Sequence, residues 1–199
     1  MKTAIFDLGN VIAFFDHNKM VAQLSLCTGL TTQGVQQFLD ISQLPHRYEC
    51  GQITSEELYQ EFLTASPKHF SRDTLYYAAA DIFTPNTQIF PLIEQLKSKN
   101  IRLVLLSNTS EAHYHFLSPR LPILSLFDAQ ILSYQIKAAK PMPAIYHAAI
   151  HEARCKSTEC FYTDDIPLFI DAAKTHGIDA VLYTDVPSLR KELSNRLVN

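Results

Sequence analysis

The chain has 199 residues, of which 47% are hydrophobic and 19% are charged, and its formal net charge is −3. This composition is typical of a globular protein and excludes a disordered or fibrous chain. Lys and Arg are scattered along the sequence, which therefore offers no basic field for a nucleic acid or for an anionic membrane surface. We expect neither of these as a partner.

The N-terminal segment and the cysteines bear on the compartment. Asp7 follows a short apolar run and leaves no room for the apolar core of a secretion signal. The four cysteines form no Cys-x-x-Cys pair, and no His stands at zinc-finger spacing. We therefore expect a cytoplasmic protein with reduced thiols, present as a monomer or a homodimer.

Short apolar runs of strand length recur along the chain and predict the strands of a sheet. In chain order they are residues 3–6, 103–106, 129–132, 160–162 and 180–183. Segments with helical spacing lie between the later runs, and a last helix is predicted from Asp185, with Leu189, Leu193 and Leu197 on one face. Continuous apolar strands that alternate with helices predict an α/β fold with a Rossmann-like parallel sheet covered on both faces.

The alternation breaks between the first and second runs, where several helical patterns occur without a clear strand. A helix is predicted to begin after Thr54, because Thr54 and Glu57 form a capping box. We therefore predict an α-helical cap over residues 15–84, inserted into a core of residues 1–14 and 85–199.

Polar residues follow the predicted strands at the points where these strands end. In a parallel sheet the carboxyl ends meet at one edge, where ligands bind. Asp7 ends the first run, and Ser107 with Asn108 ends the second. Lys140 follows the third, just before Pro141, which is predicted to begin a helix. Asp164 and Asp165 follow the fourth.

This set of residue types predicts a site for Mg²⁺ and a phosphate group. A single carboxylate at a strand end is often only a turn former, and adjacent acidic residues often cap a helix. Asp164 and Asp165 follow a buried-looking strand, however, where two carboxylates repel each other unless a cation is shared. Hard oxygen ligands suit Mg²⁺, which also offsets the repulsion between Asp7 and an incoming anion.

Four motifs in this order resemble those of the haloacid dehalogenase-like superfamily of aspartyl-nucleophile hydrolases. They are Ile5-Phe6-Asp7-Leu8-Gly9-Asn10-Val11, Leu106-Ser107-Asn108-Thr109, Lys140-Pro141 and Tyr162-Thr163-Asp164-Asp165. The start of the chain and the cap segment 48–54 further resemble the branch that contains α-D-glucose-1-phosphate phosphatase and the phosphatase domain of soluble epoxide hydrolase.

The resemblance implies a Mg²⁺-dependent phosphatase that acts on a small phosphorylated metabolite, with a sugar phosphate as the leading class. Asp7 would be the nucleophile and form an aspartyl-phosphate. Ser107 and Asn108 would hold the phosphoryl oxygens, and Lys140 would neutralise them. The metal ligands implied are Asp7, the Gly9 carbonyl and Asp165, with Asp164 holding a metal-bound water.

Two positions depart from the pattern of the superfamily. Most of its phosphatases have a second Asp two residues after the nucleophile, which acts as general acid and base, whereas this chain has Gly9. General acid–base assistance typically contributes about 10²- to 10⁴-fold in rate. Relatives also carry a polar residue shortly after the position of Asp165, where this chain is apolar from Ile166 to Ile170 apart from Pro167. The support of the metal ligands is therefore expected to be weaker.

These departures leave two alternatives open. One is a metal-independent 2-haloacid dehalogenase, which fits Gly9 but leaves the charges of Asp164 and Asp165 unexplained. The other is a catalytically weakened scaffold that binds a phosphorylated ligand or a protein partner. The resemblance further implies that the cap closes over the strand ends and selects the leaving group of the substrate. Candidate contacts in the cap include His46, Arg47, Tyr48 and Glu49, of which Arg47 and Tyr48 are the predicted substrate-binding residues.

Overall fold

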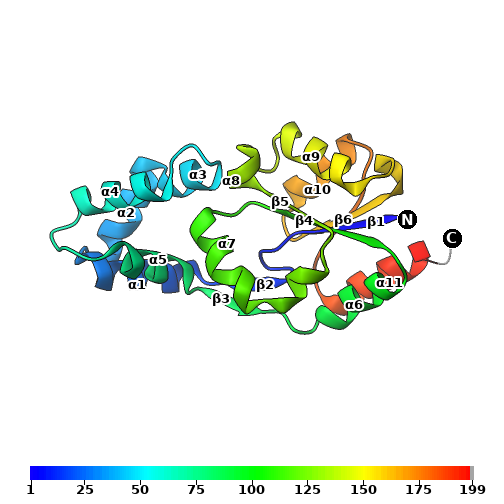
Figure 1. The fold of residues 1–199 in the computed structure, drawn as a ribbon, viewed down its shortest axis with the longest axis horizontal. Coiled ribbons are helices and arrows are strands. Elements are labelled where there is room, and N and C mark those ends of the chain that lie inside the picture. Colours follow the sequence, from blue (N-terminus) through cyan, green and yellow to red (C-terminus); the bar gives the residue numbers. More distant parts are fainter. Residues whose placement is uncertain (198–199) are drawn as a thin grey trace.

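The computed structural model describes residues 1–197 as a parallel sheet with helices on both faces and a five-helix unit at one end (Figure 1). The strands are β1 (Thr3–Phe6), β2 (Ala13–Phe15), β3 (Phe83–Pro85), β4 (Arg102–Ser107), β5 (Ala129–Leu132), β6 (Cys160–Asp164) and β7 (Asp179–Leu182). The helices of the five-helix unit are α1 (His17–Thr28), α2 (Thr32–Ser42), α3 (Leu44–Glu49), α4 (Ser55–Ala65) and α5 (Arg72–Ala80). The later helices are α6 (Phe90–Ser98), α7 (Glu111–Leu117), α8 (Ser133–Ile136), α9 (Pro143–Ala153), α10 (Pro167–Thr175) and α11 (Val186–Leu197).

The main sheet has the strand order β5-β4-β1-β6-β7, and all of its neighbouring strands are parallel. The predicted Rossmann-like α/β class is thus confirmed. β1 lies in the centre, with Phe6 level with Leu105 on one side and with Thr163 on the other. Asp7 therefore leaves the sheet between the ends of β4 and β6.

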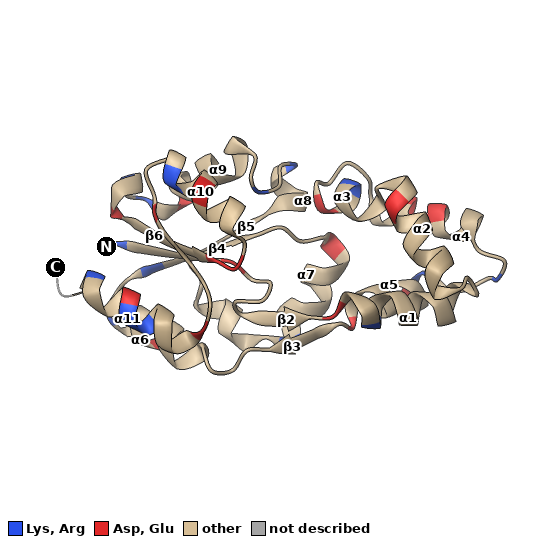
Figure 2. Ribbon diagram, turned by 180° about the vertical axis from the view of Figure 1, so that it is seen from behind, with Lys and Arg blue, Asp and Glu red and all other residues tan. Residues whose placement is uncertain are grey.

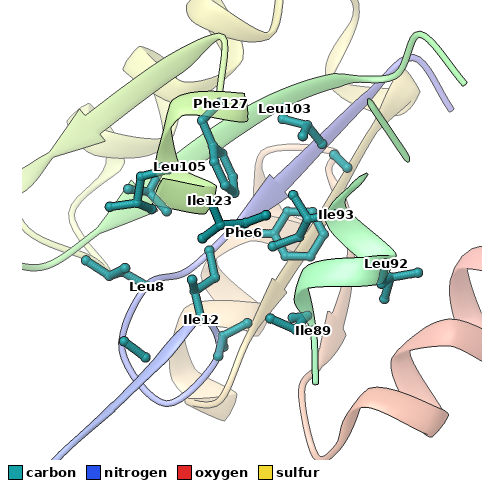
Figure 3. Packing of buried hydrophobic residues seen from close by; sticks show 14 of the residues in the cluster. Phe6, Leu8, Ile12, Ile89, Leu92, Ile93, Leu103, Leu105, Ile123 and Phe127 are labelled. Atoms are coloured by element: carbon teal, nitrogen blue, oxygen red, sulfur yellow. The ribbon is translucent and has the colours of Figure 1, made fainter. Parts of the chain in front are cut away.

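Successive residues of the central strands enter two separate cores, because side chains alternate between the faces of a sheet. Phe6, Leu103 and Leu105 pack with Ile89 and Ile93 of the α6 side (Figure 3). Ile5, Val104, Leu106 and Tyr162 pack instead against α9 and α10, with Ile145 and Ile170 among their partners. Burial on both faces explains why these strands read as unbroken apolar runs.

The five-helix unit has a third core, built by residues such as Leu24, Leu39, Leu58, Phe62 and Leu75. The capping box at the start of α4 forms as predicted: Glu57 N–H donates to Thr54 Oγ1 over 3.1 Å, and Thr54 N–H donates to Glu57 Oε2 over 2.8 Å. The division of the chain into core and cap at residues 14/15 and 84/85 stays a prediction.

Two local predictions differ from the structure. β2 precedes the five-helix unit in the chain and β3 follows it, and the two strands pair antiparallel. No strand was predicted there, because strands of three residues are too short to show an alternating pattern. Pro141 does not begin a helix: Met142 N–H donates to the Ala139 carbonyl over 2.8 Å in a turn, and α9 begins at Pro143.

Charged residues of both signs occur on the sheet-containing part and on the five-helix unit (Figure 2). Among residues 1–197, no helix combines the length and apolar character needed to span a membrane.

Candidate active site

Asp7, Lys140 and Asp164 form a buried ion cluster at the carboxyl ends of the central strands. Lys140 Nζ donates to Asp7 Oδ1 over 2.7 Å and to Asp164 Oδ2 over 2.6 Å, and it also donates to the Leu106 carbonyl over 3.2 Å. The exposed fractions of the three side chains are 1%, 8% and 0% for Lys140, Asp7 and Asp164. The sequence-predicted nucleophile, lysine and first acidic residue of the last motif are thus in direct contact.

Asp165 completes a group of three carboxylates. One oxygen each of Asp7, Asp164 and Asp165 lies within 4.8 Å of the others, so that together they could hold a cation. Asn10 Nδ2 donates to Asp165 Oδ2 over 3.0 Å. The polar partner that is missing after Asp165 in the sequence therefore comes from the loop after β1.

Asp164 is held more tightly than Asp165. Its Oδ1 accepts the Ile166 N–H over 2.9 Å, and its Oδ2 accepts hydrogen bonds from Lys140 and from the Tyr162 hydroxyl. These three hydrogen bonds fix the Asp164 carboxylate beside Lys140.

The predicted phosphate-binding residues occupy different environments. Ser107 is buried at the end of β4, and among residues 1–197 its hydroxyl makes only a long 3.4 Å bond to the Asn108 carbonyl. Asn108 is committed to the main chain of Lys140: its Oδ1 accepts the Lys140 N–H over 2.7 Å, and its Nδ2 donates to the Lys140 carbonyl over 3.0 Å. Asn108 therefore fixes the segment that carries the lysine.

Burial and charge set the protonation of the cluster. Burial raises the pKa of Asp7 to about 7, and the ammonium group of Lys140 acts in the opposite direction. Burial acts to lower the pKa of Lys140, but Asp7 and Asp164 together raise it above its usual value. Lys140 is therefore a permanent cation beside the predicted nucleophile.

Two cavities meet above this cluster. The first, of about 890 Å³ and open to solvent, is lined by all the predicted core residues except Asp164: Asp7, Gly9, Ser107, Asn108, Lys140 and Asp165. The second, of about 530 Å³, extends into the five-helix unit between apolar residues such as Leu24, Leu39 and Phe62. His17, Glu49 and His113 line both cavities.

The two predicted ligand contacts of the cap point in different directions. The Tyr48 ring lines the apolar cavity, and its hydroxyl accepts the Ala112 N–H over 3.0 Å. The Arg47 guanidinium pairs with Glu61 over 2.8 Å and lies outside the lining of both cavities. The structure therefore does not support Arg47 as a ligand contact.

Sequence reasoning missed three residues of the polar cavity, two of which also line the apolar cavity. Phe15, His17 and His113 line the polar cavity, and the His113 ring nitrogen lies 3.2 Å from the Ala79 carbonyl. Burial lowers the pKa of His113 to about 4, so its imidazole is neutral at pH 7. Neither histidine belongs to a strand-end motif, and no local pattern in the sequence marked them.

The fold and the cluster define a class of α/β proteins with a Rossmann-like parallel sheet, in which a strand-end aspartate, a lysine and two further carboxylates lie together at the carboxyl ends of the strands. Residues 1–177 match the family model described as haloacid dehalogenase-like hydrolase. The chain belongs to this family, and it is a hydrolase.

Relatives in sequence and structure agree with this assignment. Over 190 residues the chain is 24% identical to a protein named as a phosphatase from Mycobacterium tuberculosis, covering 92% of this chain and 87% of the relative. It is 26% identical over 102 residues to the phosphorylated carbohydrates phosphatase of Thermotoga maritima, covering 51% of this chain and only 47% of that relative. A haloacid dehalogenase family enzyme from Bacteroides thetaiotaomicron, solved with magnesium and inorganic phosphate, superposes with a TM-score of 0.83 at 23% identity, covering 92% and 94% of the two chains.

Proposed function

We propose that this protein is a Mg²⁺-dependent phosphatase that cleaves a small phosphate ester through an aspartyl-phosphate on Asp7. The observation that carries the proposal is the buried contact of Asp7 with Lys140, 2.7 Å apart, beside two more carboxylates at the floor of an open cavity. The names of the two curated relatives and the magnesium and phosphate of the structural neighbour support it.

The donor set fits Mg²⁺, because every side-chain ligand it offers is a carboxylate oxygen. Asp7, Asp165 and the Gly9 carbonyl would hold the ion, with Asp164 contributing through a water. When bound, Mg²⁺ would neutralise the negative charge shared by the phosphate and the aspartates.

Each residue of the site then has its own role in phosphoryl transfer. The Asp7 carboxylate attacks phosphorus and displaces the alcohol, and water later cleaves the acyl phosphate. The Lys140 ammonium neutralises the phosphoryl oxygens, and the Ser107 hydroxyl, which has no strong internal partner, binds one of them. We propose that Asn108 positions Lys140 through its two main-chain bonds, in place of the direct phosphate contact expected from the resemblance.

The five-helix unit would act as the cap, and the cavity that enters it would receive the alcohol part of the ester. A sugar phosphate follows from the resemblance to the glucose-1-phosphate phosphatase branch. The inner cavity is lined mainly by apolar side chains, however, which favours a less polar group. A useful panel therefore contains alkyl and aryl phosphates beside sugar phosphates. Within residues 1–197 the four cysteines form no disulfide, which agrees with the proposed cytoplasmic location.

Phosphate release from this panel, with and without Mg²⁺, tests the proposal. We expect Mg²⁺-dependent release by the natural protein, its loss in Asp7→Asn, and its retention in Asp171→Asn, which changes an exposed aspartate of α10. Full Mg²⁺-dependent activity of Asp7→Asn would overturn the role of Asp7. No release by a folded, Mg²⁺-binding protein would favour the weakened scaffold, and metal-independent halide release from 2-haloacids would favour the dehalogenase.

A further inference from the structure

The proposed phosphatase needs a proton donor, because an alcohol leaves phosphorus poorly as an alkoxide. Gly9 has no side chain to supply the proton, and the space beside it is filled. A Cβ atom at Gly9 would lie 2.9 Å from Cε1 of the Phe15 ring, closer than real Cβ contacts allow. A donor supplied by the protein must therefore come from another element.

Glu49 lies where such a donor is needed. It is the last residue of α3 and lines both the polar cavity over Asp7 and the apolar cavity that enters the five-helix unit. The boundary of the two cavities is where the ester oxygen would lie, with the phosphate on one side and the alcohol on the other. Glu49 is thus the carboxyl group that faces both halves of the substrate.

The Glu49 carboxyl group is also uncommitted. It makes no hydrogen bond and no ion pair with the other side chains and main-chain groups of residues 1–197, whereas Asp164 and Asp165 are both hydrogen-bonded. Burial raises the pKa of Glu49 to about 7, and the charge of Lys140 acts in the opposite direction. A substantial fraction of Glu49 therefore carries a proton at neutral pH, as a general acid requires.

The main chain next to Glu49 is fixed against the core. Gly51 adopts a φ of +59°, and a Cβ atom there would lie 2.2 Å from the carbonyl oxygen of Tyr134 in α8. Only a glycine allows this approach. The end of α3 is therefore held over the strand ends rather than carried on a free loop, which gives Glu49 a defined position.

We infer that Glu49 is the general acid and base of the reaction, supplied by the five-helix unit in place of a side chain at position 9; the inference rests on the proposed phosphatase function. In the first step the Asp7–P bond forms, the bond from phosphorus to the ester oxygen breaks, and the Glu49 proton passes to that oxygen. In the second step the Glu49 carboxylate takes a proton from the attacking water, the bond from the water oxygen to phosphorus forms, and the bond from the Asp7 oxygen to phosphorus breaks. Inorganic phosphate, ionised Asp7 and protonated Glu49 result.

Two histidines at the same boundary are the rival donors. The His113 ring is neutral and one of its nitrogens faces the Ala79 carbonyl, so it is poorly suited to give up a proton. His17 is exposed at the first position of α1, and its ring lies against Phe15 with 4.8 Å between ring centroids. Replacement of His17 is therefore the necessary comparison.

The test compares two esters of similar shape, phenyl phosphate and p-nitrophenyl phosphate. Phenolate needs a proton to leave easily, whereas p-nitrophenolate is a stable anion. The quantity measured is kcat/KM, because it covers the steps up to departure of the alcohol and excludes hydrolysis of the aspartyl-phosphate. The proteins are the natural chain, Glu49→Gln, His17→Gln, and Glu56→Gln as a control at an exposed glutamate of α4.

We expect Glu49→Gln to lose at least about tenfold more kcat/KM on phenyl phosphate than on p-nitrophenyl phosphate, within the 10²- to 10⁴-fold range of general acid catalysis. Residual turnover of p-nitrophenyl phosphate shows that this variant is folded. Equal losses on both esters would overturn the inference and leave Glu49 a positioning residue, and a selective loss in His17→Gln alone would transfer the role to His17. Failure of the natural protein to release phosphate from either ester, or full activity of Asp7→Asn, would instead overturn the proposed function itself.

Discussion

Replacement of Lys140 by Met tests how much the charge of Lys140 stabilises the buried ion cluster. The change keeps most of the side-chain volume but removes the ammonium group that lies 2.7 Å from Asp7 and 2.6 Å from Asp164. Removing one partner of a buried ion pair typically costs about 3–5 kcal/mol, because the remaining charge is left without compensation. For a chain of this size, with about 2–4 °C per kcal/mol, the melting temperature should fall by roughly 6–20 °C.

The dependence of this loss on pH follows from the carboxyl groups left behind. Burial already raises the pKa of Asp7 to about 7, and removing the cation raises it further. A carboxyl group whose pKa is raised in the folded state contributes stability at low pH that is lost as the pH rises through that pKa. The stability difference between the natural protein and Lys140→Met should therefore be small near pH 5 and larger near pH 8.

Urea unfolding followed by circular dichroism, at several pH values and with or without Mg²⁺, measures both effects. Lys174→Met, at an exposed position of α10, is the matched control and should change the unfolding free energy by less than about 0.5 kcal/mol. Mg²⁺ should stabilise Lys140→Met more than the natural protein, because it supplies the missing positive charge. A loss no larger than that of the control, or one independent of pH, would refute the reasoning.

Two other changes probe the contacts around the cavities. Gly51→Ala should destabilise the protein by about 2–4 kcal/mol and lower its activity, since it adds left-handed strain of about 1–2 kcal/mol and a clash with Tyr134. Gly34→Ala within α2 is the control. Equal melting temperatures of Gly51→Ala and the natural protein would contradict the close approach of Gly51 to Tyr134. For His113, burial lowers the pKa from 6.5 to about 4, so the unfolded chain binds the extra proton and stability is lost as the pH falls. Between pH 8 and pH 5 this loss of unfolding free energy is about 2 kcal/mol. Urea unfolding at several pH values should show a smaller loss in His113→Gln. An unchanged dependence of the unfolding free energy on pH would argue against the buried neutral ring.

The sequence was sufficient to predict the sheet and the charged residues at the centre of the site. The central strand β1 is buried throughout, and the predicted run 3–6 coincides with it; the run 129–132 likewise coincides with the edge strand β5, although β5 is only partly buried. Asp7, Lys140 and Asp164 could be placed together because each follows a strand or its connecting loop, and the carboxyl ends of parallel strands meet. These signals are local, and topology alone brings them to one place.

The sequence was less informative where a contact depends on the orientation of a side chain. The side-chain amide of Asn108 is a group that could bind phosphate, yet it is hydrogen-bonded to the main chain of Lys140, 32 residues away. Arg47 and Glu49 belong to the same polar cluster, but only Glu49 lines the cavities. A difference of two residues rotates a side chain by about 200° around a helix, and only the packing of α3 decides which one faces the site.

The sequence by itself therefore determined which segments form the strands of the sheet and which charged residues form the cluster, because both follow from periodicity and from residues at strand ends. Tertiary structure alone decided how the five-helix unit sits on the sheet, that Phe15 fills the space beside Gly9, and that Gly51 brings Glu49 to the boundary of the two cavities. The physical reason is that these contacts join elements far apart in the chain, whose distances and directions are set by packing and leave no pattern in the local sequence.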